Sequence, residues 1–127
     1  MTARKSPIGR ARGHGSAKAG ATTWWHQRLT AVALVPLGFW FAASMVAHTG
    51  ASQAEIVEWL GSRRTAVMMT LLIVATFYHF KLGMQVVIED YVEHQVLKLA
   101  SLVLVNFACI ALTFIGIISV LKLSIAG

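Results

Sequence analysis

The hydrophobic positions of this chain fall into three long blocks rather than the spaced pattern of a soluble protein. The blocks run from Leu29 to Ala47, from Thr65 to Ile88 and from Leu99 to Leu121. Each can cross a bilayer core of about 30 Å as a helix that rises about 1.5 Å per residue. None alternates polar and apolar residues as the strands of a membrane barrel do. The pattern therefore predicts an all-α membrane protein, since helices satisfy their own backbone in lipid.

The predicted spans form one membrane domain with a polar segment ahead of it. We place them at about residues 29–48, 65–89 and 98–121 of a domain that covers residues 24–127. Residues 1–23 contain no acidic residue and are rich in glycine, serine, alanine and basic side chains. Such a segment has little apolar surface to bury, which predicts a flexible cytoplasmic tail.

The segment between the first two spans has the signals of a short helix of its own. Ser52 and Glu55 have the spacing of a capping box, in which each side chain bonds the backbone of the other residue. Three apolar side chains after them share one helical face: Ile56, Trp59 and Leu60. We expect an interfacial helix that lies on the outer membrane surface and connects the spans.

Composition and charge agree with a membrane protein. Hydrophobic residues make up 57% of the chain and charged residues 13%, with a mean hydropathy of +0.68, which excludes an ordinary soluble domain. The formal charge of +6 lies mainly beside the spans, so we expect contact with the lipid bilayer and no nucleic-acid partner. Seven basic residues fall on the N-terminal side (Arg4, Lys5, Arg10, Arg12, Lys18, Arg28 and Lys98) and three on the opposite side (Arg63, Arg64 and Lys122). The positive-inside rule then places the N-terminus in the cytoplasm, and a bacterial inner membrane is favoured over a mitochondrial inner membrane.

One ionisable side chain lies deep in the second span. His79 is the fifteenth of the 24 residues from Thr65 to Ile88, near the middle of the bilayer. A polar group at that depth is costly and is expected to face protein or a ligand. Depth alone leaves two explanations open: a hydrogen bond to a neighbouring helix, or ligation of a haem iron, for which neutral imidazole is an ordinary ligand.

The helical period places a small residue beside this histidine. At about 100° per residue, Gly83 lies about 40° from His79, and Asp90 lies about 20° from it at the cytoplasmic end of the span. The glycine leaves room for another helix or for the face of a flat macrocycle. Lys81 lies about 200° from His79 and is expected to pair with a neighbouring subunit or to extend toward the interface.

Tyr91 closes the second span next to Asp90, about 16–18 Å beyond His79 along the helix axis. A tyrosine at this boundary is ordinarily an aromatic anchor. Beside a carboxylate, and near Arg28 at the start of the first span, it is also placed to donate a hydrogen bond to a polar headgroup.

Two motifs resemble those of a known family. The run HFKLGMQVVIEDYV, from His79 to Val92, is similar to the H-x-x-x-G…D-Y signature of the D-type membrane anchors of succinate dehydrogenase. The run RLTAVAL, from Arg28 to Leu34, resembles the R-x-T-A run that opens the first span of that family. C-type anchors carry an H-R-x-T-G run instead, whereas this chain reads HQRLTA, so the resemblance is to the D-type.

The resemblance implies a place in a respiratory complex. In that family a flavoprotein subunit oxidises succinate, an iron–sulfur subunit carries the electrons, and ubiquinone is reduced where that subunit meets the anchors. Two anchors, one D-type and one C-type, hold one haem b between them. The resemblance gives four residues a role: His79 as axial ligand of the haem iron, Arg28 near the haem propionates, Tyr91 as hydrogen-bond donor to the quinone, and Asp90 as its acidic neighbour.

Three functions remain open from the sequence. The first is the haem- and quinone-binding anchor of a succinate dehydrogenase, with no succinate chemistry on this chain. The second is the anchor of a related fumarate reductase. The third is a small structural or transport membrane protein in which His79 and Lys81 make a polar helix contact. His79 is the one histidine deep in a span, so a second axial ligand has to come from another chain or from a methionine.

The charge bias makes the topology testable. Three spans that start from a cytoplasmic N-terminus leave the C-terminus outside. A reporter fused after Gly127 is therefore expected to be active in the periplasm, or on the outer side of an organelle's inner membrane, when assayed in whole cells. A cytoplasmic signal would mean that one span has been miscounted.

Overall fold

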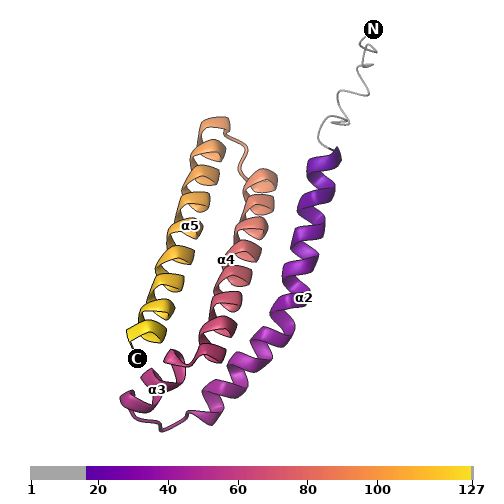
Figure 1. Ribbon diagram of the computed structural model, residues 1–127. Helices are drawn as coiled ribbons and strands as arrows, with labels where there is room; N and C mark the ends of the chain where they lie inside the picture. The colour runs from indigo at the N-terminus through magenta and orange to yellow at the C-terminus, as the bar shows by residue number, and fades with distance from the viewer. Residues whose placement is uncertain (1–16, 127) are drawn as a thin grey trace, which may run out of the picture.

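The computed structural model describes residues 17–126, which form four helices. In chain order these are α2 (Ala17–Ala47), α3 (Gln53–Gly61), α4 (Arg63–Tyr91) and α5 (Gln95–Ala126). Three long helices with a short one after the first confirm the all-α prediction (Figure 1). Of the expected tail, residues 17–23 form the first turns of α2, and residues 1–16 lie outside the described range, as does Gly127.

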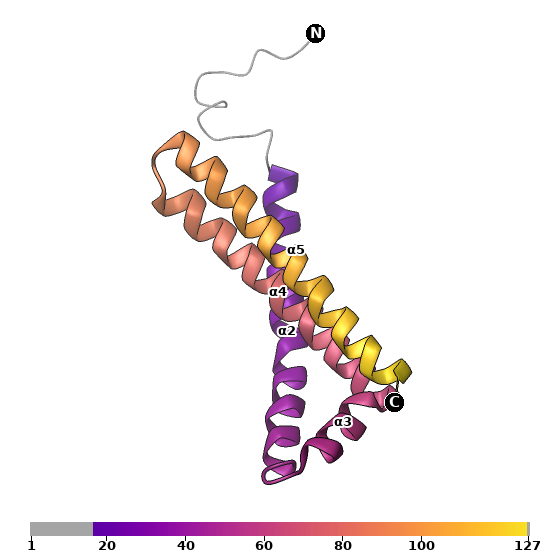
Figure 2. The same ribbon diagram turned by 90° about the vertical axis from the view of Figure 1, so that its left-hand side faces the viewer.

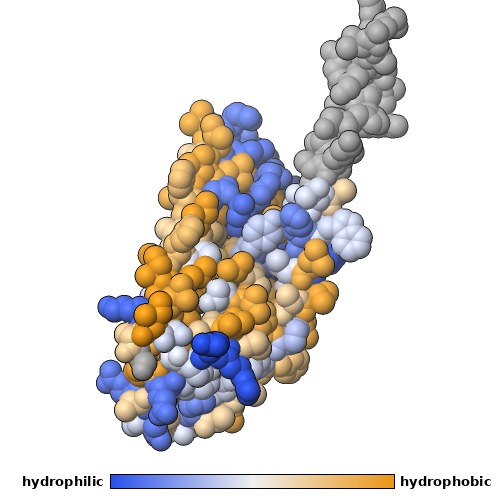
Figure 3. All heavy atoms as spheres, viewed as in Figure 1, coloured by the Kyte–Doolittle hydropathy of each residue, from blue (hydrophilic) through white to orange (hydrophobic). Residues whose placement is uncertain are grey.

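The three long helices are each long and apolar enough to cross a membrane, as the sequence predicts. Only 6%, 17% and 11% of the most apolar stretches of α2, α4 and α5 are buried within the chain. Figure 3 shows apolar side chains mainly over the middle of the helices and hydrophilic ones mainly toward their ends. Most of the apolar surface is therefore left to lipid or to other subunits.

α4 lies between the other long helices. It packs against α5 and against α2. The short α3, which connects α2 to α4, packs against α4 and α5. Both views show α4 and α5 side by side, and Figure 2 shows α2 crossing them at an angle. The side chains of α4 that are buried lie at intervals along it: Thr65, Ala66, Ala75, Leu82 and Ile88. α4 is thus held by contacts with two long helices, α2 and α5.

α2 continues as one helix through Pro36. Proline has no N–H, so the carbonyl of Val32, four residues earlier, receives no helical hydrogen bond from it. In Figure 1 the axis of α2 changes direction along its length, which is the usual effect of an internal proline.

α3 begins with the predicted capping box. The Ser52 N–H donates to Glu55 Oε2 at 2.6 Å, and the Glu55 N–H donates to Ser52 Oγ at 3.3 Å. The backbone hydrogen bond from Ser52, then its side-chain hydrogen bond and the nearby His48, lower the pKa of Glu55 from its ordinary value. The predicted apolar face is the half-buried side of the helix, at Ile56, Trp59 and Leu60.

An aromatic cluster joins α3 to the end of α2. The Trp59 ring lies 4.5 Å from the His48 ring and 6.0 Å from the Trp40 ring, measured between centroids. His48 Nδ1 is 2.8 Å from the carbonyl oxygen of Ser44, which fixes the imidazole on its own helix end. The connector between the first two spans is therefore packed against them.

Two glycines lie where helices approach each other closely: Gly116 on α5 and Gly61 at the end of α3, beside α5. A Cβ added at Gly116 would lie 3.1 Å from Ile73 Cγ2 and 3.2 Å from its Cδ1 on α4. A Cβ added at Gly61 would lie 3.1 Å from the carbonyl oxygen of Leu123. Small residues at such points let membrane helices pack closely.

Replacing Gly116 by leucine is expected to destabilise the α4–α5 contact by about 1–3 kcal/mol, the ordinary cost of overpacking. Gly38→Leu is the matched control, because a Cβ added at Gly38 meets nothing within 4 Å. Both changes raise helix propensity equally, so thermal unfolding in detergent, followed by circular dichroism, isolates the packing effect. Equal midpoints for the two variants would contradict a close contact at Gly116.

Candidate functional site at the contact between α2 and α4

His79 lies half-buried where α2 crosses α4. Its Nδ1 atom is 2.9 Å from Oγ1 of Thr30 on α2. Within residues 17–126 His79 makes no other hydrogen bond. The one enclosed side-chain nitrogen or oxygen without a partner among these residues is Gln27 Oε1, so Nε2 of His79 is accessible at the surface of this chain.

The residue before His79 makes a second contact between the same helices. The hydroxyl of Tyr78 lies 2.6 Å from Nδ1 of His26, one helical turn before Thr30 on α2. Lys81 places its Nζ 5.6 Å from the centre of the Tyr78 ring, a cation–π distance. His26 thus contacts Tyr78, and so does Lys81, which was expected to pair with a neighbouring subunit or to extend toward the interface.

Gly83 faces α2 one turn beyond His79. A Cβ built at Gly83 would lie 3.8 Å from Nε2 of Gln27, an ordinary van der Waals distance, so this amide lies beside the glycine without crowding it. The Oε1 atom of the same amide is enclosed and accepts no hydrogen bond in the described part of the chain. An enclosed acceptor without a donor costs about 1–3 kcal/mol, which marks this point of the contact as polar and incompletely satisfied.

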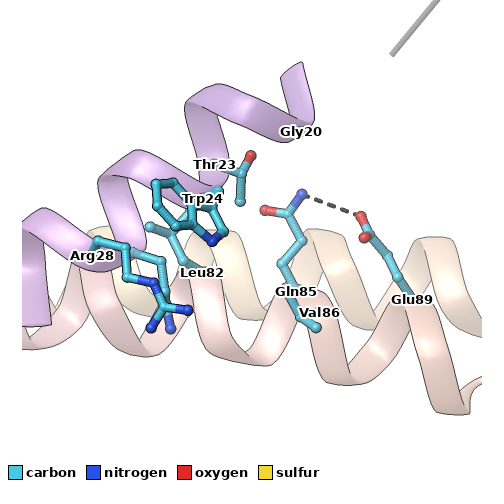
Figure 4. A pocket seen from close by; sticks show the side chains of 9 residues that line it. Gly20, Thr23, Trp24, Arg28, Leu82, Gln85, Val86 and Glu89 are labelled. Atoms are coloured by element: carbon cyan, nitrogen blue, oxygen red, sulfur yellow. Dashed lines mark hydrogen bonds between the residues drawn. The ribbon is translucent and has the colours of Figure 1, made fainter. Parts of the chain in front are cut away.

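A groove of about 530 Å³ opens between α2 and α4 beyond Gly83. Figure 4 shows Trp24 and Arg28 extending from α2 toward α4, and Gln85 and Glu89 on the facing helix. The guanidinium of Arg28 lies 5.3 Å from the centre of the Trp24 ring, and Gln85 Nε2 donates to Glu89 Oε1 at 3.2 Å. The groove is lined by Gly20, Thr23, Trp24, Gln27, Arg28, Leu82, Gln85, Val86 and Glu89.

Asp90 and Tyr91 lie at the end of α4, outside this groove. Both are exposed, and Tyr91 retains 81% of its accessible surface. Tyr91 follows Leu82 by nine residues, which is about 180° around the helix, so it projects from the opposite side. Among the described residues no ion pair joins Asp90 to Arg28; the carboxylate that lines the groove with Arg28 is that of Glu89.

The partners that the structure gives to the predicted residues were not expected from the sequence. Thr30, Gln27 and Tyr78 gave no signal by depth or charge, although Thr30 is the threonine of the R-x-T-A run. The spacing of His26 and Thr30, four residues apart on one face of α2, was the available clue. Side-chain pairing between two helices depends on their crossing, which a periodic pattern does not contain.

The donor set of the site is a single imidazole. Within residues 17–126 no three His, Cys, Asp or Glu side chains gather closely enough to hold a metal ion. One accessible imidazole nitrogen suits an iron whose equatorial ligands come from a porphyrin and whose other axial ligand comes from elsewhere. The residues present therefore fit one side of a haem.

Comparison with known proteins agrees with the two motifs. Residues 2–118 match the family model described as the succinate dehydrogenase/fumarate reductase transmembrane subunit. The chain belongs to this family. Its membership confirms the resemblance drawn from the histidine and arginine motifs, and with it the prediction of a membrane anchor.

Relatives of this transmembrane subunit family carry a more specific name. The succinate dehydrogenase hydrophobic membrane anchor subunit of Rickettsia bellii is 36% identical over 115 residues, which cover 90% of each chain. That of Rickettsia conorii is 32% identical over 84% of this chain and 85% of its own. That of Paracoccus denitrificans is 29% identical over 80% of this chain and 79% of its own. No solved structure matches this chain significantly.

Proposed function

We propose that this chain anchors a succinate dehydrogenase in the bacterial inner membrane, ligates one haem b through His79 and forms part of the ubiquinone-reduction site. The observation that carries the proposal is the state of His79. Its imidazole lies in a membrane-spanning helix, is held at Nδ1 by Thr30 and leaves Nε2 accessible at the surface of this chain. A polar nitrogen without a partner is costly within a membrane-spanning helix, and a ligand from outside this chain would satisfy it.

The partners follow from the family resemblance. One accessible imidazole supplies one axial ligand, and the resemblance implies that a second anchor subunit, of the C-type, supplies the other. The largely unburied apolar surface of the three spans offers area for that subunit as well as for lipid. A bound haem b supplies one-electron chemistry, while succinate oxidation belongs to the flavoprotein subunit and electron delivery to the iron–sulfur subunit.

Arg28 and Gly83 have supporting roles in this proposal. Arg28 precedes Thr30 by two residues, about 3 Å along α2 toward the end of the span at which Tyr91 lies. Its guanidinium is exposed at the groove, available to a propionate carboxylate. Gly83 adds no side-chain bulk one turn from His79, and the room it leaves serves the edge of the macrocycle beside the Gln27 amide.

The quinone role rests on the end of α4. Tyr91 is exposed at the predicted cytoplasmic boundary, where the iron–sulfur subunit reaches it, and Asp90 beside it is also exposed. Quinone reduction takes up protons as well as electrons, so the quinone oxygens need hydrogen-bond donors that stay in place as charge develops. A tyrosine hydroxyl donates while neutral near pH 7.

The direction of the reaction has two candidates. The family description names fumarate reductase beside succinate dehydrogenase. The relatives described above are all named as succinate dehydrogenase subunits, which favours succinate oxidation with ubiquinone as acceptor.

Replacing His79 by alanine is expected to remove the low-spin haem spectrum of the purified complex, because the axial imidazole is lost. His94→Ala is the matched control, since His94 lies in the exposed connector between α4 and α5. Absorption spectra of both variants, oxidised and reduced, provide the measurement. A His79→Ala complex with the parent spectrum would refute the ligand assignment.

Tyr91→Phe retains the aromatic ring at the membrane boundary and removes only the hydroxyl. If the lost hydrogen bond is worth more than about 1.4 kcal/mol in the transition state, succinate:ubiquinone reductase activity falls by more than tenfold. The haem spectrum and the subunit composition of the complex should stay as in the parent. Parental quinone reduction in this variant would leave Tyr91 as a membrane anchor only.

A further inference from the structure

Thr30 contacts His79 through a hydroxyl that also lies close to two carbonyl oxygens of its own helix. The hydroxyl oxygen of Thr30 lies 2.8 Å from the carbonyl oxygen of His26, 3.0 Å from that of Gln27 and 2.9 Å from His79 Nδ1. A hydroxyl has one hydrogen to donate, and two carbonyl oxygens of its own helix lie within donating distance of it. When the hydrogen goes to either carbonyl, the hydroxyl oxygen is left to accept a hydrogen bond from a protonated Nδ1.

The state of the second nitrogen follows from the first. In a neutral imidazole, a protonated Nδ1 leaves Nε2 with a free electron pair. Nε2 is also the nitrogen of His79 that makes no hydrogen bond within residues 17–126 and stays accessible. With the proton on Nδ1, the metal-binding form of the imidazole lies at the accessible side.

We propose that Thr30 is a positioning residue for the haem ligand: it holds His79 as the Nδ1–H tautomer and fixes the rotation of its ring, so that Nε2 remains available to the iron. This inference rests on the proposed haem function of His79. It gives the threonine of the R-x-T-A run a chemical role, distinct from that of Arg28 two residues earlier.

The physical effect of such a contact is on the ligand rather than on the iron directly. An acceptor behind a ligating imidazole raises the basicity of the ring, and its loss typically costs 10–100-fold in metal affinity. A more basic ligand stabilises ferric iron more than ferrous iron, because the oxidised ion carries the higher charge. Removing the Thr30 hydroxyl should therefore weaken haem binding and raise the reduction potential.

A purely structural role for Thr30 makes a different forecast. If the hydroxyl only helped α2 to pack on α4, its loss would lower stability without changing the electronic properties of the bound haem. The reduction potential and the tautomer of His79 therefore separate the two roles, whereas activity or yield alone would not.

The first experiment uses three variants of the assembled complex. Thr30→Val keeps the shape of the side chain and removes the hydroxyl, and Thr30→Ser restores a hydroxyl. Thr113→Val is the matched control, because the Thr113 hydroxyl bonds only the Cys109 carbonyl of its own helix, at 2.7 Å. Haem content per complex and the midpoint potential of the haem are measured for each.

Thr30→Val is expected to retain haem with about tenfold lower affinity. If ferric binding falls about tenfold more than ferrous binding, the midpoint potential rises by about 59 mV. Thr30→Ser and Thr113→Val should both stay at the parent potential. A parent potential in Thr30→Val, or an equal rise in Thr113→Val, would overturn the proposal.

The second experiment reads the tautomer without haem, which keeps the proposal testable if Thr30→Val fails to assemble. The full chain is labelled with ¹⁵N-histidine, purified in detergent, and the imidazole nitrogens of His79 are assigned by comparison with His79→Ala. The parent and Thr113→Val are expected to show Nδ1 protonated and Nε2 bare. Thr30→Val is expected to lose this preference, and a tautomer unchanged in Thr30→Val would contradict the positioning role.

The two proposals fail in different ways. A His79→Ala complex that keeps its haem spectrum would refute the haem function itself. A His79→Ala complex that loses the spectrum, together with a Thr30→Val complex at the parent potential, would refute only the role of Thr30.

Discussion

Two side-chain hydrogen bonds determine how the first span sits on the second. His26 meets Tyr78, and one turn later Thr30 meets His79. Lipid gives helices no hydrophobic drive to associate, so packing and polar contacts select the arrangement. Each such bond is worth only about 0.6 kcal/mol on average in a membrane protein. Two of them, one turn apart on α2 and at adjacent positions of α4, still specify a register and a rotation that apolar surfaces alone would leave open.

The small enclosed interior explains why so few contacts have this influence. Among the described residues the buried side chains are few, and no large one is fully enclosed. Membership of a family of transmembrane subunits accounts for this, because lipid and partner subunits cover the remaining surface in a complex. The chain alone specifies the order and crossing of its helices, and it leaves the groove beside Arg28 and Glu89 open.

Hydrophobic blocks and capping signals predicted the type and order of the helices, although α2 begins at Ala17, within the segment expected to be a tail. The capping box at Ser52 and the apolar face of α3 appear as expected, since both depend on neighbours within one turn. The expected depth of His79 in the second span follows from residue number alone, because a helix rises by a fixed distance per residue. Three features could not be predicted from the sequence: the contact of His79 with Thr30, the enclosed amide of Gln27, and the position of Glu89 rather than Asp90 beside Arg28. Each depends on the crossing of two helices, which is set by contacts between residues far apart in the chain.

The position of α4 between two long helices has a consequence for the order in which the chain matures. α4 and α5 are joined by residues 92–94 alone and pack on each other without α2. The oxygen that faces the His79 ring, however, comes from a residue 49 positions earlier in the chain. Contacts of large sequence separation form late, since the loop between them must close first. The contact between Thr30 and His79 therefore forms only when the first span has docked on α4, which makes it a property of the completed fold and not of the helix that carries the histidine.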